Sequence, residues 1–326
     1  MNQRVFQNIF FISKIRAIIC VCSLFSLNGF SQTSGNTPKI NMAVETYSYL
    51  KGQNAALQRI SMQFPSLKDN VEALQKNSVM LFSRAEKNIE HILEKELEKS
   101  EYNRLKNQIR SFLSKFKDPI QKKKHAEDFL DKVKERSLVK DDSQISKALL
   151  SFAYHDKPHQ EITDGHLKTF TTKGHPKAVK STVTIPIPKS WKAEDAEMPE
   201  TIQQFTSFNG NGSEKILIVI YEPDHGFVLN ESVVPQMLDP QTDLIRTETI
   251  TIDGKQGIMA ECEQILDPPK NKIKIRMLQF MVAAEKKLYC FQGSIGPAAS
   301  SENLEIQLKK FEPLFRLIVS KAQIEN

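Results

Sequence analysis

The segment Thr182-Val183-Thr184-Ile185-Pro186-Ile187-Pro188 marks the point at which the hydrophobic period of the 326-residue chain changes. Val183, Ile185 and Ile187 alternate with other residues, and a two-residue period is typical of a β-strand with one buried face. Upstream of this segment, apolar residues recur at spacings of three and four, which is the period of an amphipathic helix. The sequence therefore predicts an α+β chain, in which a helical region precedes a β-rich domain.

The predicted helical region covers residues 40–156. Its clearest apolar stripe starts after Pro65 and consists of Leu67, Val71, Leu74, Ser78, Leu81, Ala85, Ile89 and Ile92. Three further apolar stripes follow at Tyr102 to Phe116, which Asp118-Pro119 ends, at Ala126 to Val133, and at Ile145 to Phe152. We expect Asp142 to cap the last helix. Several amphipathic helices with short connections predict antiparallel packing into a bundle or hairpin stack.

Residues 157–180 are expected to form a connector, because turn sequences such as Asp164-Gly165 and Gly174-His175-Pro176 occur there without a periodic apolar face. The domain at 181–326 then begins with the strand at 182–188. Pro186 and Pro188 cannot donate backbone hydrogen bonds, so we expect this strand at an edge of its sheet.

The rest of the domain is predicted as antiparallel strands and two helices. Asn209-Gly210-Asn211-Gly212 is expected to be the turn of a hairpin, and further elements are predicted at 201–208, 214–221, 231–238 (a short helix), 245–252, 257–266, 271–284 and from 287 onward. A last helix has an inner face of Leu304, Leu308, Phe311, Phe315 and Ile318, and Pro313 is expected to kink it. The strand at 273–283 is apolar on both faces from Met277 onward, so the sheet needs cover on both sides.

The predicted register of these strands keeps Cys262 and Cys290 apart. A turn at Asp267–Lys270 places Cys262 opposite Ile275, and a turn at Glu285-Lys286 places Cys290 opposite Met281. The two cysteines then lie two strands apart, with an offset of roughly 20 Å along the strand. A disulfide requires Cα atoms within about 7 Å. We therefore predict two free, buried thiols and no disulfide between Cys262 and Cys290.

The N-terminal residues 1–31 have the pattern of a secretory signal peptide. Arg4, Lys14 and Arg16 form a positive region, an eleven-residue apolar run follows at 17–27, and Gly29-Phe30-Ser31 supplies small residues for cleavage after Ser31. The apolar run is shorter than the roughly 20 residues of a membrane-spanning helix. The sequence predicts an exported, periplasmic or secreted protein without a membrane span after cleavage.

The charge distribution argues against a nucleic-acid partner. The formal net charge is +6, and three of the positive charges belong to the predicted signal peptide. Neither of the remaining parts has the one-sided field that contacts with a phosphate backbone require.

Three stretches of the C-terminal domain are similar to one known family. They are Val183 to Trp191 near the start of the domain, Lys287-Leu288-Tyr289-Cys290-Phe291-Gln292-Gly293-Ser294 near its end, and Phe311 to Ile318 in the last helix. In these stretches the sequence resembles the PsbP-like α/β/α sandwich family. The mature chain, including Thr172 to Pro176, also resembles an uncharacterised group of exported Bacteroidota-type proteins. The family resemblance implies a non-enzymatic accessory or binding role, and no partner-binding motif of the family is matched.

Four histidines, His155, His159, His166 and His175, fall within 21 residues and are candidate ligands for a transition metal, with Asp156 or Asp164 as an oxygen ligand. Their spacing matches none of the established zinc patterns, and no mature cysteine is near. The alternative interpretation is a polar connector whose histidines are solvated or cap helices, and we favour it.

Other candidate sites have structural interpretations that we favour. Trp191 is a possible floor for a ligand groove, or it packs in the core. Glu261 and Glu263 share a strand face, which suits paired-carboxylate chemistry, or they form a surface charge ladder with basic residues opposite. Gly293-Ser294-Ile295-Gly296 lacks the spacing of a nucleophile elbow. Gln279 and Gln292 are expected to face each other as a hydrogen-bonded pair.

The sequence thus favours an exported, non-enzymatic envelope protein without a cofactor, which binds another envelope protein or a small ligand. Two alternatives remain open. One is a metal-dependent enzyme built on the histidine-containing connector, and the other is a structural oligomer formed by the helical region.

Overall fold

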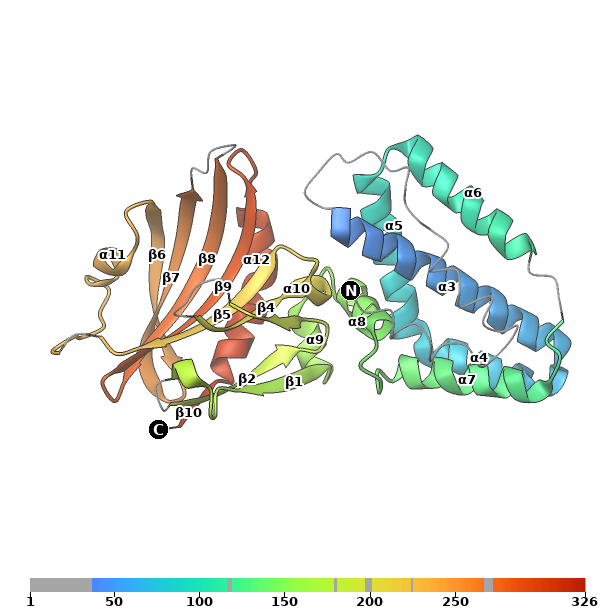
Figure 1. Cartoon of the computed structure of the whole chain (residues 1–326), viewed down its shortest axis with the longest axis horizontal. Coiled ribbons are helices and arrows are strands. Elements are labelled where there is room, and N and C mark those ends of the chain that lie inside the picture. Colours follow the sequence, from blue (N-terminus) through green and yellow to red (C-terminus); the bar gives the residue numbers. More distant parts are fainter. Residues whose placement is uncertain are drawn as a thin grey trace. The chain divides into compact units, whose positions relative to one another are not determined.

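The computed structural model describes residues 37–115, 119–178, 181–196, 201–223, 225–266 and 272–325 (Figure 1). The chain divides into two compact units, Met1–Ala153 and Tyr154–Asn326. The predicted signal peptide, the end of the second apolar stripe at 116–118 and the turn at 267–270 lie outside the described residues. Within the described residues, no helix combines the length and the apolar character that a bilayer crossing requires.

The first unit is helical, as the three-and-four spacing predicts. Its helices are α3 (Thr37–Gln63), α4 (Lys68–Ser78), α5 (Arg84–Glu96), α6 (Lys99–Lys115), α7 (Lys123–Ser137) and α8 (Gln144–Ala153). The stripe that starts after Pro65 is buried, but it is not one helix, because a π-helical turn at Val79–Ser83 separates α4 from α5. The predicted cap at Asp142 is wrong, since the Ser146 amide N–H donates to the Ser143 hydroxyl at the start of α8.

The second unit contains two antiparallel sheets (Figure 1). The smaller sheet has the order β1-β2-β10 and the larger sheet has the order β3-β4-β5-β9-β8-β7-β6. The strands are β1 (Leu167–Thr171), β2 (Thr182–Pro188), β3 (Lys192–Glu194), β4 (Thr201–Thr206), β5 (Glu214–Tyr221), β6 (Thr242–Ile252), β7 (Lys255–Leu266), β8 (Ile273–Ala284), β9 (Lys287–Ala299) and β10 (Gln323–Glu325). The helices are α9 (His159–Thr163), α10 (Ser207–Gly210), α11 (Val234–Met237) and α12 (Glu305–Ser320).

Two expectations about the start of this unit need correction. The expected connector at 157–180 contains α9 and β1, and β1 pairs with β2 along its whole length. The strand β2 is not an edge strand, because β10 pairs with it on the other side. That second pairing covers only Thr182 to Thr184, so the half of β2 that carries Pro186 and Pro188 needs no donors toward β10.

The larger sheet is covered differently on its two faces. Helix α12 covers one face, where Leu308, Phe311 and Phe315 pack against the apolar side chains of β8 and β9. On the other face, Val234 of α11 and the flanking apolar residues cover Ile258, Cys262 and Met281. The predicted short helix at 231–238 is therefore only the four-residue α11, and most of the cover on this face is irregular chain.

The predicted register is confirmed for β8 and β9, where Cys290 lies opposite Met281 and Gln292 lies opposite Gln279. The predicted register of β7 and β8 is wrong by two residues, since Cys262 lies opposite Met277 and not opposite Ile275. The offset between the cysteines falls to roughly 13 Å along the strand. Both thiols are free, Cys262 is buried and Cys290 is partly buried. Burial raises the pKa of the Cys262 thiol to about 11 and that of Cys290 to about 12.

Candidate functional site

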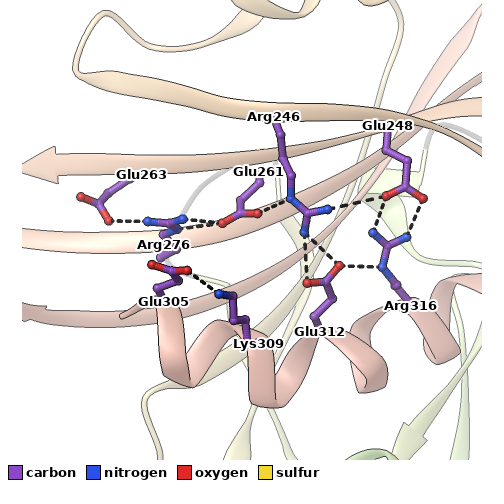
Figure 2. Close-up of polar contacts among 9 residues, drawn as sticks. All are labelled: Arg246, Glu248, Glu261, Glu263, Arg276, Glu305, Lys309, Glu312 and Arg316. Atoms are coloured by element: carbon purple, nitrogen blue, oxygen red, sulfur yellow. Dashed lines mark hydrogen bonds and ion pairs between the residues drawn. The ribbon is translucent and has the colours of Figure 1, made fainter. Parts of the chain in front are cut away.

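A groove of about 440 Å³ lies between the first half of α12 and the strands β6, β7 and β8. We call it the charged groove. Arg246, Glu261 and Arg276 come from the neighbouring strands β6, β7 and β8, and their side chains point toward α12 (Figure 2). The helix contributes residues that lie three and four positions apart, which places them on one helix face. The lining residues are Ile245, Arg246, Glu261, Arg276, Glu305, Leu308, Lys309 and Glu312.

Glu261 is the central carboxylate of the charged groove. Its side chain accepts hydrogen bonds from Arg246 Nε at 2.5 Å and from Arg276 Nη2 at 2.5 Å, and its residue is only 6% exposed. Burial by itself raises the pKa of a carboxyl group, but the hydrogen bonds from the two arginines outweigh it. The pKa of Glu261 therefore lies below its ordinary value, and the group stays ionised at neutral pH.

A second set of ion pairs joins the sheet to α12. Arg246 Nη2 lies 3.0 Å from both carboxylate oxygens of Glu312, and Glu312 Oε1 accepts from Arg316 Nε at 2.8 Å. Arg316 Nη2 in turn donates to Glu248 Oε2 at 2.6 Å (Figure 2). The network alternates in sign from β8 to the helix, so each of these groups lies beside a group of opposite charge.

The rim of the charged groove is more exposed than its centre. Lys309 Nζ and Glu305 Oε1 form an ion pair at 2.5 Å across one helical turn, and their side chains are 70% and 45% exposed. The hydrogen bond from Lys309 is the main cause that lowers the pKa of Glu305. Ile245, which is 44% exposed, adds apolar surface beside the charges. This arrangement suits the binding of a group that carries charge of its own, because both signs are within reach.

Sequence reasoning found part of this site. It placed Glu261 and Glu263 on one strand face with basic residues opposite, and Arg276 of β8 does contact both carboxylates. It missed Arg246 and the contribution of α12. The signal available for the helix was the charge at residues 305, 309, 312 and 316, whose spacing follows one helix face.

The four candidate histidines lie in different surroundings. His155 Nδ1 is 3.0 Å from Asp156 Oδ1, and Lys310 Nζ lies 3.2 Å from His155 Nε2. His159 belongs to α9, His166 packs against the Tyr154 ring, and His175 Nδ1 accepts from the Lys177 amide. In the part of the chain that the structure describes, no three histidine, cysteine or acidic side chains are grouped to hold a metal ion.

The remaining candidates occupy structural positions. Trp191 is 3% exposed and packs against Phe311 of α12. Gln279 Nε2 donates to Gln292 Oε1 at 3.3 Å. Gly293 lies directly beneath the ring of Phe315, so this glycine serves the packing of α12 on β9. The segment 207–213, which includes the expected turn at 209–212, joins β4 to β5, and Phe208 and Asn209 adopt positive φ within it.

The structure also brings together a serine, a lysine and a tyrosine that sequence reasoning missed. Lys287 Nζ and the Tyr289 hydroxyl both donate to the Ser181 hydroxyl oxygen, at 2.8 and 3.1 Å. Such a group resembles an activated nucleophile in composition. However, Ser181 is 2% exposed and Tyr289 is fully buried, so a substrate has no access to the hydroxyl. The cluster instead ties the residue before β2 to the larger sheet.

A buried carboxylate, Glu161 of α9, lies outside the charged groove. Its two oxygens accept from the Ser190 amide and the Ser190 hydroxyl, both at 2.7 Å. Burial raises the pKa of Glu161 to about 7, although the hydrogen bonds from Ser190 oppose the shift. Because the folded state prefers the protonated form, Glu161 stabilises the fold fully only below its unfolded pKa near 4.5, and this stabilisation is lost as the pH rises through about 7.

We expect Glu161→Gln to remove this pH dependence. Glutamine keeps an acceptor for the Ser190 amide and stays neutral, so the variant gains up to about 3 kcal/mol relative to wild type between pH 5 and pH 8. Urea unfolding followed by Trp191 fluorescence measures the effect, because this single tryptophan lies in the core of the second unit. The control Glu222→Gln removes an exposed carboxylate, and its free energy of unfolding should change with pH in parallel with that of the wild type. The prediction would be contradicted if the free energy of unfolding of the wild type and that of Glu161→Gln had the same dependence on pH.

Comparisons with known proteins find similarity in structure only. No protein-family profile matches the chain, and no curated protein sequence matches it. The cyanobacterial PsbP protein CyanoP from Synechocystis sp. PCC 6803 aligns with 49% of this chain and 93% of its own length, at 17% identity and a TM-score of 0.34. LpqN of Mycobacterium tuberculosis, described as involved in cell envelope biogenesis, aligns with 52% of this chain and 98% of its own, at 12% identity and a TM-score of 0.31.

A protein of unknown function from Pseudomonas aeruginosa, PA94, aligns with 48% of this chain and 96% of its own length. The identity is 12% and the TM-score is 0.26.

Proposed function

We propose that the chain is an exported, non-enzymatic binding protein of the cell envelope, and that the charged groove holds a charged segment of a partner protein. The observation that carries this proposal is the pairing of the groove's carboxylates with cations. Glu261 and Glu312 contact arginines, and Glu305 contacts Lys309. The groove therefore offers fixed charges of both signs.

The same pairing speaks against general acid or base chemistry in the groove. A catalytic carboxylate that exchanges protons near neutral pH needs a raised pKa. The pKa values of Glu261 and Glu305 are lowered instead, so both groups are ionised when the partner arrives. Ionised side chains at fixed positions favour recognition of a partner with complementary charges.

A protein segment fits the groove because its rim is open and amphipathic. Lys309 and Glu305 are exposed on α12, and Ile245 is 44% exposed on β6. A segment with an acidic and a basic side chain around an apolar one would satisfy all three features. Export rests on the charged and apolar regions of residues 1–31 and on the small residues before the expected cleavage point.

Site-specific photo-cross-linking in the native envelope tests the proposal. A photoreactive amino acid at Lys309 should capture one discrete species, and the same residue at Lys321, an exposed position at the end of α12, should not. The charge reversal Glu305→Lys should reduce the capture at position 309. Equal capture at both positions, or none at 309, would contradict the proposed role of the groove. A turnover of the purified mature chain that one point substitution abolishes would contradict the non-enzymatic role.

A further inference from the structure

The strand β6 ends the larger sheet and is long for an edge strand. It has 11 residues, and β7 is its partner on one side. Among the described residues, no other strand pairs with its outer edge. Asp243, Ile245 and Thr249 are exposed along it. A long edge presents unpaired backbone donors and acceptors, which a further strand can use.

The sequence of β6 is self-complementary around Thr247. If a second copy of β6 runs antiparallel with Thr247 opposite its own equivalent, Arg246 of each copy lies opposite Glu248 of the other copy. Both side chains point to the α12 face, since their partners in β7 are Glu261 and Met259. They are 41% and 43% exposed, so each retains an open side. Opposite charges directly across a pair of strands are stabilising.

The neighbouring registers lack this match. Centring the pair on Glu248 places two glutamates opposite each other, and centring it on Arg246 does the same with two arginines. Centring it on Thr249 sets Glu248 against Ile250 and Arg246 against Ile252. A symmetric pair cannot be centred between two residues, because side chains on opposite faces of the strand would then lie opposite each other. The charges therefore select one register.

We propose that two copies of this chain associate through β6, antiparallel and centred on Thr247, so that their larger sheets become continuous. The β-bulge between Leu244 and Arg246 interrupts the regular ladder and limits the paired length. The contact is consequently smaller than a standard protein interface, and we expect a dissociation constant in the micromolar range or weaker. The contact uses the outer edge of β6 and shares Arg246 with the charged groove, whose other charged residues lie on β7, β8 and α12. Dimer formation and cross-linking at Lys309 are measured separately, so the absence of a dimer would leave the proposed function untouched.

Disulfide trapping tests the register. The single-cysteine addition Thr247→Cys should give a covalent dimer under mild oxidation, because the two Cα atoms would lie about 5 Å apart. The matched control Thr251→Cys, four residues along the same face, should not, because its symmetry mate would lie far along the strand. Equal cross-linking of the two variants would overturn the proposed register.

Sedimentation velocity on the unaltered chain tests the association itself. The sedimentation coefficient should rise with concentration and fall back when salt is added, because screening weakens the two Arg246–Glu248 pairs. A concentration-independent monomer over a hundredfold range would overturn the proposal, and would mean that the bulge and the charges protect the edge.

Discussion

Gly293→Ala is expected to lower the free energy of unfolding of the second unit by about 2 to 3 kcal/mol. A Cβ atom at this position would lie 2.3 Å from Cγ and 2.4 Å from Cδ2 of Phe315, which is well inside van der Waals contact. Phe315 is 2% exposed and belongs to the hydrophobic core of the second unit. Helix α12 also resists displacement, because Arg316 and Glu312 hold it to the sheet.

The sign of this effect is diagnostic. Replacing a strand glycine by alanine normally stabilises a protein by roughly 0.5 kcal/mol or more, since alanine loses less backbone entropy on folding. The double variant Gly293→Ala with Phe315→Leu should lose less free energy of unfolding than the two single variants lose together, because the smaller side chain relieves the clash. Urea unfolding followed by Trp191 fluorescence gives all three values. An unchanged or raised stability of Gly293→Ala would show that α12 does not pack on β9 as described.

Glu261→Ala is expected to lower the free energy of unfolding by about 3 kcal/mol or more at neutral pH. The substitution removes the carboxylate that Arg246 and Arg276 share, and the Arg276 side chain is only 15% exposed. A cation left in such a place has lost its closest counter-charge and cannot be fully hydrated. The loss is measured by urea unfolding of the variant and the wild type under the same conditions.

The matched control for this prediction is Glu305→Ala, which breaks the exposed pair with Lys309. Exposed ion pairs contribute little, so Glu305→Ala should lower the free energy of unfolding far less than Glu261→Ala does. The pH dependence has a defined sign as well. Because the pKa of Glu261 is lowered by folding, its contribution is present above pH 4.5 and is lost as the pH falls through the lower folded value. A cost of Glu261→Ala no larger than that of Glu305→Ala would contradict the central place of Glu261 in the network.

The registers show what sequence periodicity decides and what it leaves open. Glu285 and Lys286 both have positive φ, so a two-residue turn fixes the pairing of β8 with β9, and that pairing was predictable. The pairing of β7 with β8 was not, because a shift by two residues leaves every side chain on the same face of the sheet. The hydrophobic pattern alone does not separate these two registers.

The strand β1 escaped prediction for a related reason. Its sequence, Leu167-Lys168-Thr169-Phe170-Thr171, has two apolar residues three positions apart, which is not the period of a strand. It lies at the edge of the smaller sheet, where its side chains are only partly buried, so burial imposes little alternation on it. Its pairing with β2 becomes apparent only in three dimensions.

The sequence predicts the part of the charged groove that lies on β7 and β8, but not the part on β6 and α12. The acidic and basic residues of β7 and β8 indicated a charge ladder, since alternate residues of a strand share a face. The bulge between Leu244 and Arg246 turns the Arg246 side chain toward α12. The sequence around the bulge has no pattern that predicts this change of face. The charged residues of α12 lie beside the sheet because Phe315 packs over Gly293, and this tertiary contact cannot be predicted from local sequence.

The most direct test of the account is the titration of the glutamate side chains by ¹³C NMR of the carboxyl groups in the intact mature chain. We expect the pKa of Glu261 to lie below its ordinary value, whereas the pKa of Glu161 in the same spectra should be about 7. The first result would show that the central carboxylate of the groove is a fixed charge near neutral pH and does not exchange protons there. A titration of Glu261 near neutral pH would contradict it, because the groove would then contain a group poised for acid and base catalysis.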